Sequence, residues 1–210
     1  MKRKRIGVTR PTDGLDKLFI KRGWDATVLP LFKNLKEEPD LDYIAFSGGV
    51  DVAPELYGHE RHPFSDPVDW GREESDIDYH SLYRSIPKIG VCRGAQFLSV
   101  MNGSYLYQHI HSQEHNGNHT VVDVETGAPV RVTSVHHQAC VVKDGWRLLA
   151  VARTACPVEG ESRKTVNEDC YVPEAFYIPQ DTALCVQFHP EYNHLETENY
   201  FFELFERLKL

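Results

Sequence analysis

The residues best suited to chemistry are Cys92, His189 and Glu191, and Cys92 has the most informative setting. It is the centre of "GVCRG", where an apolar strand-forming run gives way directly to a helical pattern. A tight strand-to-helix turn strains the residue at its centre, and glycines two positions before and after remove the Cβ atoms that would collide there. The N-terminus of a helix also favours the thiolate form of cysteine. The stretch predicts a catalytic cysteine, with a buried structural thiol as the alternative.

A thiolate nucleophile needs an imidazole, and His189 in "VQFHPEY" is the predicted partner. His189 ends an apolar run, and Pro190 pushes it toward extended geometry. Because side chains two residues apart in an extended chain share a face, Glu191 can fix the tautomer and orientation of the imidazole. The alternative is a surface His-Pro turn. The three residues together predict a catalytic triad for acyl transfer.

Acyl transfer also requires N–H donors for the developing oxyanion. The stretch "AFSGGVD" places Gly48 and Gly49 at the end of a predicted strand, where small residues leave backbone N–H groups free to face a ligand. The N–H of Arg93, next to the nucleophile, is the second predicted donor. A Gly-Gly pair after a strand is also an ordinary turn.

The elements that must position these residues follow an alternating pattern in the first half of the chain. Strand-like and helical runs alternate, which indicates βαβ units and a parallel sheet with helices on both faces. The predicted strands are 3–9, 25–31, 41–49 and 87–91, and the predicted helices are 13–23, 72–85 and 95–103. In such a sheet ligands bind beyond the carboxyl ends of the strands, where Cys92 would stand.

The second half consists mainly of short β-runs, which predict antiparallel additions to the sheet. They are 119–124, 129–135, 147–153, 174–179 and 183–189. The chain closes with a predicted helix over 194–210, with one apolar face formed by Leu195, Tyr200, Phe201, Leu204 and Leu208. Residues 157–172 form the most loop-like part. The whole is an α/β protein with a mostly parallel central sheet, and we expect a single domain over residues 1–210.

Length and charge limit the classes of function. The length of 210 residues suits one compact core. No apolar run reaches the ~20 residues that a membrane span needs. The net charge of −8, without a basic face, argues against a nucleic-acid partner. With no export signal and an odd count of five cysteines, we expect free thiols in the cytoplasm. Cys140 and Cys185 lie in apolar runs and are predicted core residues. A disulfide between Cys156 and Cys170 remains an alternative to free thiols.

Four blocks occur in a familiar order: "FSGGVDVAPELYG", "GVCRGAQ", "TSVHHQAC" and "VQFHPEY". Together they resemble class I glutamine amidotransferase-type hydrolases, most closely the γ-glutamyl-γ-aminobutyrate hydrolase-like branch. The resemblance implies a flavodoxin-like fold, a Cys-His-Glu triad at Cys92, His189 and Glu191, and an oxyanion hole from the amides of Gly49 and Arg93. It implies no metal and no organic cofactor.

The same resemblance assigns substrate contacts. Gln96 matches a residue that helps to hold a γ-glutamyl group, and Gly48 lies in the block at the oxyanion hole. Ser134, His136, His137 and Gln138 match a block that lines the site opposite the nucleophile. Gln96 as a helix-surface side chain, and a structural role for at least one member of the His-His-Gln run, are the alternatives. An acidic loop at 157–172 departs from the usual pattern, so specificity carries over poorly.

Three functions are open on the sequence. The first is a free-standing hydrolase that cleaves a γ-glutamyl amide or isopeptide bond of a small-molecule substrate through a γ-glutamyl thioester. The second is a glutaminase subunit that delivers ammonia to a separate synthetase. The third is an inactive binding protein on the same fold. The leaving amine and a homodimeric state stay open.

A cluster of histidines is the one metal-like signal. His109, His111, His115 and His119 fall within a short span, and imidazoles at such spacing can bind Zn²⁺. We expect instead a loop near the rim of the site, with His119 leading into a strand, and no metal.

Overall fold

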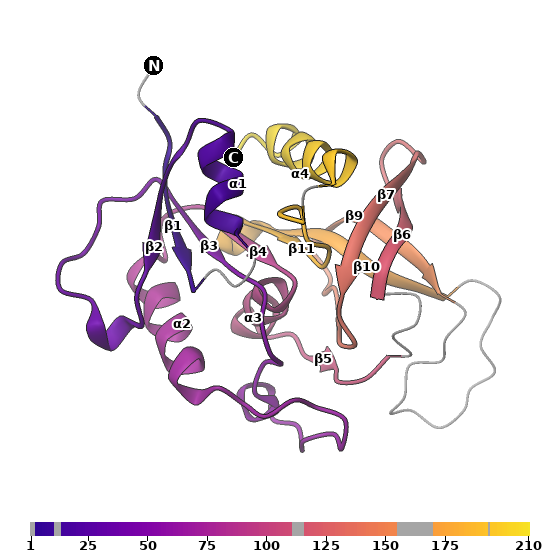
Figure 1. Cartoon of the computed structure of the whole chain (residues 1–210). Coiled ribbons are helices and arrows are strands. Elements are labelled where there is room, and N and C mark those ends of the chain that lie inside the picture. The colour runs from indigo at the N-terminus through magenta and orange to yellow at the C-terminus, as the bar shows by residue number, and fades with distance from the viewer. Residues whose placement is uncertain (1–2, 11–13, 111–115, 155–169, 193) are drawn as a thin grey trace.

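The computed structural model describes residues 3–10, 14–110, 116–154, 170–192 and 194–210. Its centre is a nine-stranded sheet in the order β2-β1-β3-β4-β11-β10-β9-β6-β7 (Figure 1). The first five strands in this order are parallel to their neighbours, and the remaining four pair antiparallel. The α/β class and the antiparallel additions of the second half are therefore confirmed.

The bounds of the elements are as follows. The parallel strands are β1 (Arg5–Thr9), β2 (Asp25–Leu29), β3 (Tyr43–Phe46), β4 (Lys88–Val91) and β11 (Ala183–Val186). The antiparallel strands are β6 (Asn116–Asp123), β7 (Pro129–Val135), β9 (Arg147–Thr154) and β10 (Cys170–Ile178), and a separate pair joins β5 (Leu106–Tyr107) to β8 (Ala139–Cys140). The α-helices are α1 (Leu15–Lys21), α2 (Trp70–Leu82), α3 (Arg93–Met101) and α4 (Leu195–Arg207), with 3-10 turns η1 (Phe32–Asn34), η2 (Pro54–Tyr57) and η4 (Pro179–Asp181).

Four of the parallel strands, β1, β3, β4 and β11, are almost entirely buried because helices cover both faces of the sheet, whereas the edge strand β2 is largely exposed. Figure 1 shows α1 and α4 on one face of the sheet and α2 and α3 on the other. Along β11, Leu184 and Val186 pack into the core that contains α1 and α4, whereas Ala183 and Cys185 pack into the core that contains α3. This alternation is the period-two geometry of a strand. Cys185 and Cys140 are both buried core residues, as predicted.

The apolar face of α4 differs from the prediction at one residue. Tyr200, Phe201 and Leu204 are buried against the sheet, but Leu195 is 66% exposed. Leu195 is the first residue of the helix, and nine residues separate it from Leu204. At 3.6 residues per turn this spacing is two and a half turns, so the two side chains point in opposite directions.

The segment predicted as loop at 157–172 is partly strand, since β10 begins at Cys170. The long strand pairs with β9 and extends well before the predicted start at residue 174. Residues 155–169, with Cys156, lie outside the described part of the chain. Among the described residues, no helix combines the length and apolarity needed to cross a bilayer.

The sheet order places the chemically interesting segments together. β3, β4 and β11 are adjacent and parallel, so their carboxyl ends share one edge of the sheet. Gly48 and Gly49 follow β3, Cys92 follows β4 and His189 follows β11. β7 is the last strand in the sheet order, but it also reaches the site. The N–H of His189 donates to the carbonyl of Thr133 in β7 at 2.8 Å.

Candidate active site

Cys92 occupies a strained turn between β4 and α3. Its backbone has φ 51° and ψ −110°, a conformation that L-residues rarely adopt. A Cβ on Gly90 would lie 2.7 Å from the Cα of Ala95, and a Cβ on Gly94 would overlap the carbonyl oxygen of Phe46. The glycines on either side of the nucleophile are therefore required by backbone packing, which was the reason given for them from the sequence.

The thiol of Cys92 faces the cavity side of this turn. The N–H of Cys92 donates to Val186 at 2.8 Å and anchors the turn to β11. Its Sγ donates to the carbonyl of Val135 at 3.7 Å, which places β7 across from the nucleophile. Arg93 is the first residue of α3, where N–H groups have no acceptor within the helix and point outward.

His189 lies between the thiol and a carboxylate. Its Nδ1 is 2.8 Å from Oε1 of Glu191, both side chains are buried, and the ring stacks on Tyr192 with 4.4 Å between centroids. Burial disfavours the imidazolium, but the Cys92 thiolate and the Glu191 carboxylate outweigh burial and raise the pKa of His189 to about 10. This arrangement can hold a thiolate–imidazolium pair.

The loop after β3 passes directly beside this group. A Cβ on Gly48 would lie 2.9 Å from Cε1 of His189 and 3.8 Å from Cβ of Cys92. Gly49 has φ 152° and lines the cavity. Gly49, one predicted source of an oxyanion donor, therefore lines the same cavity as Cys92, and Arg93, the other, directly follows Cys92 at the start of α3.

A cavity of about 450 Å³ opens at this edge of the sheet, a volume typical of small-molecule sites. Seven residues singled out from the sequence line it, and they are Gly49, Cys92, Gln96, His136, His137, Gln138 and His189. Further lining residues are Val50, Asp51, Asp66, Asn116, Val135 and Tyr192. The sequence reasoning assigned no role to Asp51 or Asp66, although Asp51 lies inside the quoted block "FSGGVDVAPELYG".

The wall opposite the nucleophile is organised around the backbone of Gln138. Its carbonyl accepts from Nε2 of Gln96 at 3.4 Å and from Nδ1 of His136 at 2.9 Å. Ser134 is fully buried and lies outside the set that lines the cavity. It lies on the same face of β7 as Val132, which packs into the core, so we assign it no substrate contact, in contrast to the sequence-based expectation.

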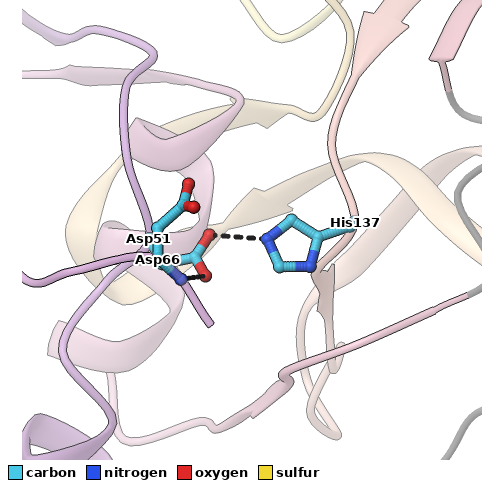
Figure 2. Close-up of side chains that lie close together, drawn as sticks. All are labelled: Asp51, Asp66 and His137. Carbon is cyan, nitrogen blue, oxygen red and sulfur yellow. Dashed lines mark hydrogen bonds and ion pairs between the residues drawn. The ribbon is translucent and has the colours of Figure 1, made fainter. Parts of the chain in front are cut away.

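Asp51, Asp66 and His137 meet on the remaining wall, where Figure 2 shows the imidazole facing the carboxylates. Nε2 of His137 is 3.1 Å from Oδ1 of Asp51, and the N–H of Asp66 donates to Oδ2 of Asp51 at 2.8 Å. The hydrogen bond to Asp51 raises the pKa of His137. These three groups are near enough to one another to hold a cation, but both oxygens of Asp51 already accept hydrogen bonds within the chain.

The predicted histidine cluster divides between two environments. Nδ1 of His109 lies 3.3 Å from Nδ1 of His137, whereas Nε2 of His119 lies 3.6 Å from Oε1 of Glu174. His119 lies within β6, which begins at Asn116, three residues before the predicted start of this strand. His111 and His115 lie outside the described residues, so the zinc alternative is not tested there.

The fold and the site define a class I glutamine amidotransferase-like protein. The sequence model of the Peptidase C26 family matches residues 35–191, and the chain belongs to that family. The match includes the Gly-Gly loop, the nucleophile turn and the His-Pro-Glu segment. Membership supports a cysteine hydrolase of the amidotransferase type.

Individual relatives agree with this family. "Putative glutamine amidotransferase-like protein YvdE" of Lactococcus lactis is 33% identical over 214 residues, which cover 90% of this chain and 83% of that protein. "Putative glutamine amidotransferase Rv2859c" of Mycobacterium tuberculosis is 33% identical over 157 residues, 72% of this chain, but the chain spans only 51% of that relative.

Two further similarities are weaker or more partial. The carbamoyl phosphate synthase small chain of Methanococcus maripaludis is 31% identical over 115 residues, 53% of this chain and 28% of that one. A solved glutamine amidotransferase from Thermotoga maritima superposes with a TM-score of 0.61 over 99% of this chain and 84% of that one. At 20% identity, that likeness shows the shared fold alone.

Proposed function

We propose that the protein hydrolyses γ-glutamyl amide bonds, with Cys92 as nucleophile, His189 as acid and base, and Glu191 as the group that orients the imidazole. The observation that carries the proposal is the position of His189. Its Nδ1 is 2.8 Å from Oε1 of Glu191, and interaction with Cys92 raises its pKa. Cys92 and His189 both line a cavity large enough for a small molecule. Such a set is the arrangement of an activated nucleophile with its base and orienting group.

The first half of the reaction forms a thioester. The Cys92 thiolate attacks the γ-carbonyl carbon, a C–S bond forms, and the carbonyl π electrons move to oxygen. The N–H groups of Gly49 and Arg93 hold that oxyanion. When the intermediate collapses, the C–N bond breaks and the His189 imidazolium transfers its proton to the departing amine.

The second half releases glutamate. Neutral His189 takes a proton from water as the water oxygen attacks the thioester carbon. The C–S bond then breaks, glutamate leaves, and the thiolate–imidazolium pair is restored. Glu191 keeps the same nitrogen of the imidazole bonded throughout, so the other nitrogen always faces the reacting atoms.

The substrate would lie along the cavity wall. Gln96, His136 and His137 line the cavity and are the proposed contacts, while Gly48 leaves the space that His189 occupies. A volume of about 450 Å³ leaves room beyond a γ-glutamyl group for an amine substituent. This room favours a γ-glutamyl amine over glutamine itself, whose leaving group is ammonia.

The second candidate is a glutaminase subunit that supplies ammonia to a synthetase. The similarity to a carbamoyl phosphate synthase small chain, the smaller part of a larger enzyme, favours it. In that case the isolated chain would act slowly on glutamine and would accelerate when its partner is added.

The test is turnover by the purified chain with γ-glutamyl amines, including γ-glutamyl-γ-aminobutyrate, and with glutamine. Hydrolysis of γ-glutamyl amines that exceeds glutaminase activity, and that the C92A variant lacks, would support the proposal. Glutamine turnover that requires a copurifying protein would favour the subunit. Absence of turnover on every γ-glutamyl compound, with or without such a protein, would contradict both and favour an inactive binding protein.

A further inference from the structure

Four charged side chains are buried together behind the Gly48–Gly49 loop. Arg72, Glu73 and Asp76 come from α2, and Arg93 comes from the start of α3. Each is at most 4% exposed. The two positive charges are matched by two negative charges. Pairing of this kind offsets the free-energy cost of removing buried charges from water. This cluster is not predicted from the sequence, which indicates over 72–85 only an amphipathic helix with acidic residues in its first turn.

Arg72 binds the loop through two adjacent carbonyls. Its Nη1 donates to Gly48 O at 2.7 Å, and its Nη2 donates to Ser47 O at 2.8 Å. A Cβ on Gly49 would overlap Nη1, so the loop can approach the guanidinium only with glycine at that position. The planar fork of arginine suits two acceptors side by side, which the single ammonium of lysine cannot match.

The carbonyl that Arg72 binds belongs to the same peptide unit as the N–H of Gly49. A peptide unit is planar and trans, so its C=O and N–H point in opposite directions. By fixing the Gly48 carbonyl on one side, Arg72 directs the Gly49 N–H to the other side, away from the guanidinium. Gly49 lines the cavity, whereas Arg72 does not.

Arg93 supplies the second oxyanion donor through its backbone, and its side chain is held by the same cluster. Its Nη2 lies 2.8 Å from Oε1 of Glu73, and its Nη1 pairs with Oδ2 of Asp76. That same Oδ2 of Asp76 also accepts from Nε of Arg72 at 3.4 Å. Glu73 meanwhile accepts the N–H of Ala53 at 3.2 Å and so holds the chain beyond the loop.

We infer that Arg72 and Asp76 are positioning residues for the oxyanion hole. Asp76 joins Arg72, which orients the Gly49 amide, to Arg93, whose own amide is the other donor. One carboxylate thereby fixes the spacing and direction of two N–H groups that come from separate elements. The inference rests on the proposed function, since it concerns the oxyanion of that reaction.

The test separates oxyanion stabilisation from the thiolate and from substrate binding. The variants are R72K, which keeps the charge but loses the paired donors, and D76N, which keeps the shape but loses the charge. D78N, at an exposed position of the same helix, is the matched control. Three quantities are measured: kcat and KM for γ-glutamyl amide hydrolysis, the rate of Cys92 alkylation by iodoacetamide, and binding of glutamate.

Alkylation by iodoacetamide creates no oxyanion on a carbonyl, so it reports the thiolate alone. We expect kcat to fall about 10²-fold in R72K and D76N, while alkylation, glutamate binding and KM change less than about threefold. D78N should match the wild type in every measurement. If D76N does not fold, R72K decides the result.

Equal kcat in the wild type and the folded variants would overturn the inference. A parallel loss of alkylation and hydrolysis would overturn it too, because the cluster would then act on the nucleophile or on the fold. A wild type without hydrolysis of any γ-glutamyl amide would instead contradict the proposed function, so the two failures are distinguishable.

Discussion

Gly48 and His189 approach each other so closely that position 48 has no room for a side chain. A Cβ there would lie 2.9 Å from Cε1 of the imidazole, whereas the Gly48 backbone itself is in a conformation open to other residues. The constraint is therefore steric, and it acts on the residue that we propose to be the acid and base.

Replacing Gly48 with alanine should impair catalysis without unfolding the protein. The methyl group would push the imidazole away from Cys92 and Glu191, and a displacement of this kind typically costs about 10²-fold in rate. We expect kcat/KM for γ-glutamyl amide hydrolysis to fall by that amount in G48A. G71A is the control, because a Cβ at Gly71 makes only an ordinary contact with Asp69. Wild-type activity in G48A would show that His189 does not need its present position.

The pH dependence of kcat/KM should report His189. The imidazolium, which donates the proton to the leaving amine, exists below its pKa and is lost above it. Since the pKa of His189 is raised to about 10, kcat/KM should stay high through neutral pH and fall as the pH rises through about 10.

Glu191 contributes to that raised pKa, so changing it should move the alkaline limb. In E191Q the carboxylate is lost while the shape is retained, and the limb should shift to lower pH together with a lower rate. The measurement is a pH–rate profile of both proteins. A limb that stays in place would mean that Glu191 does not set the protonation of His189.

The backbone strain at Cys92 should be visible in stability. With φ 51° and ψ −110°, any L-residue at this position costs roughly 1–3 kcal/mol, and glycine removes most of that cost while adding some unfolded-state entropy. The free energy of unfolding of C92G should therefore be about 1 kcal/mol higher than that of C92A, which makes C92G the more stable variant. Both variants lack the thiol and should be inactive. Urea denaturation measures the difference, and equal or reversed stabilities would argue against strain.

Local patterns in the sequence were enough to predict the nucleophile turn. Gly90 is required by a contact with Ala95 that a tight strand-to-helix turn creates, whereas Gly94 is required by the backbone of Phe46 in the neighbouring strand β3. The pairing of His189 with Glu191 was predicted from an extended segment, whereas the structure places Pro190 and Glu191 in a turn that still leaves Nδ1 of His189 2.8 Å from Oε1 of Glu191. The order of parallel strands then brought them to one edge.

Other parts of the site depend on packing between distant segments. Arg72 and Asp76 read as part of a charged helix, and only the contact of α2 with the Gly48–Gly49 loop shows that they are buried. Ser134 was grouped with its neighbours by sequence position, but it faces the core whereas Val135 lies beside Cys92. Successive side chains of a strand point to opposite faces of the sheet, so neighbouring residues of one sequence motif can have different environments.

The charge of the cavity should influence the choice of leaving amine. Among the described residues that line it, Asp51 and Asp66 carry negative charge and none is lysine or arginine. A γ-glutamyl amide whose amine carries a second ammonium should be cleaved at least about tenfold faster, by kcat/KM, than one whose amine carries a carboxylate.

The exposed Asp66 offers a direct check of this preference. In D66N the ratio of kcat/KM between the cationic and anionic substrates should decrease, and E74Q on the exposed side of α2 should leave it unchanged. Equal rates on both substrates in the wild type would show that the acidic wall does not face the leaving group.

The most direct measurement is mass spectrometry of the protein quenched in acid during turnover of a γ-glutamyl amide. The account predicts that one γ-glutamyl group is attached to the peptide that contains Cys92, that hydroxylamine removes it, and that H189A accumulates less of it. Burial raises the pKa of the Cys140 and Cys185 thiols, so neither should carry the group. Hydrolysis without any adduct on Cys92, or an adduct on another cysteine, would contradict the account.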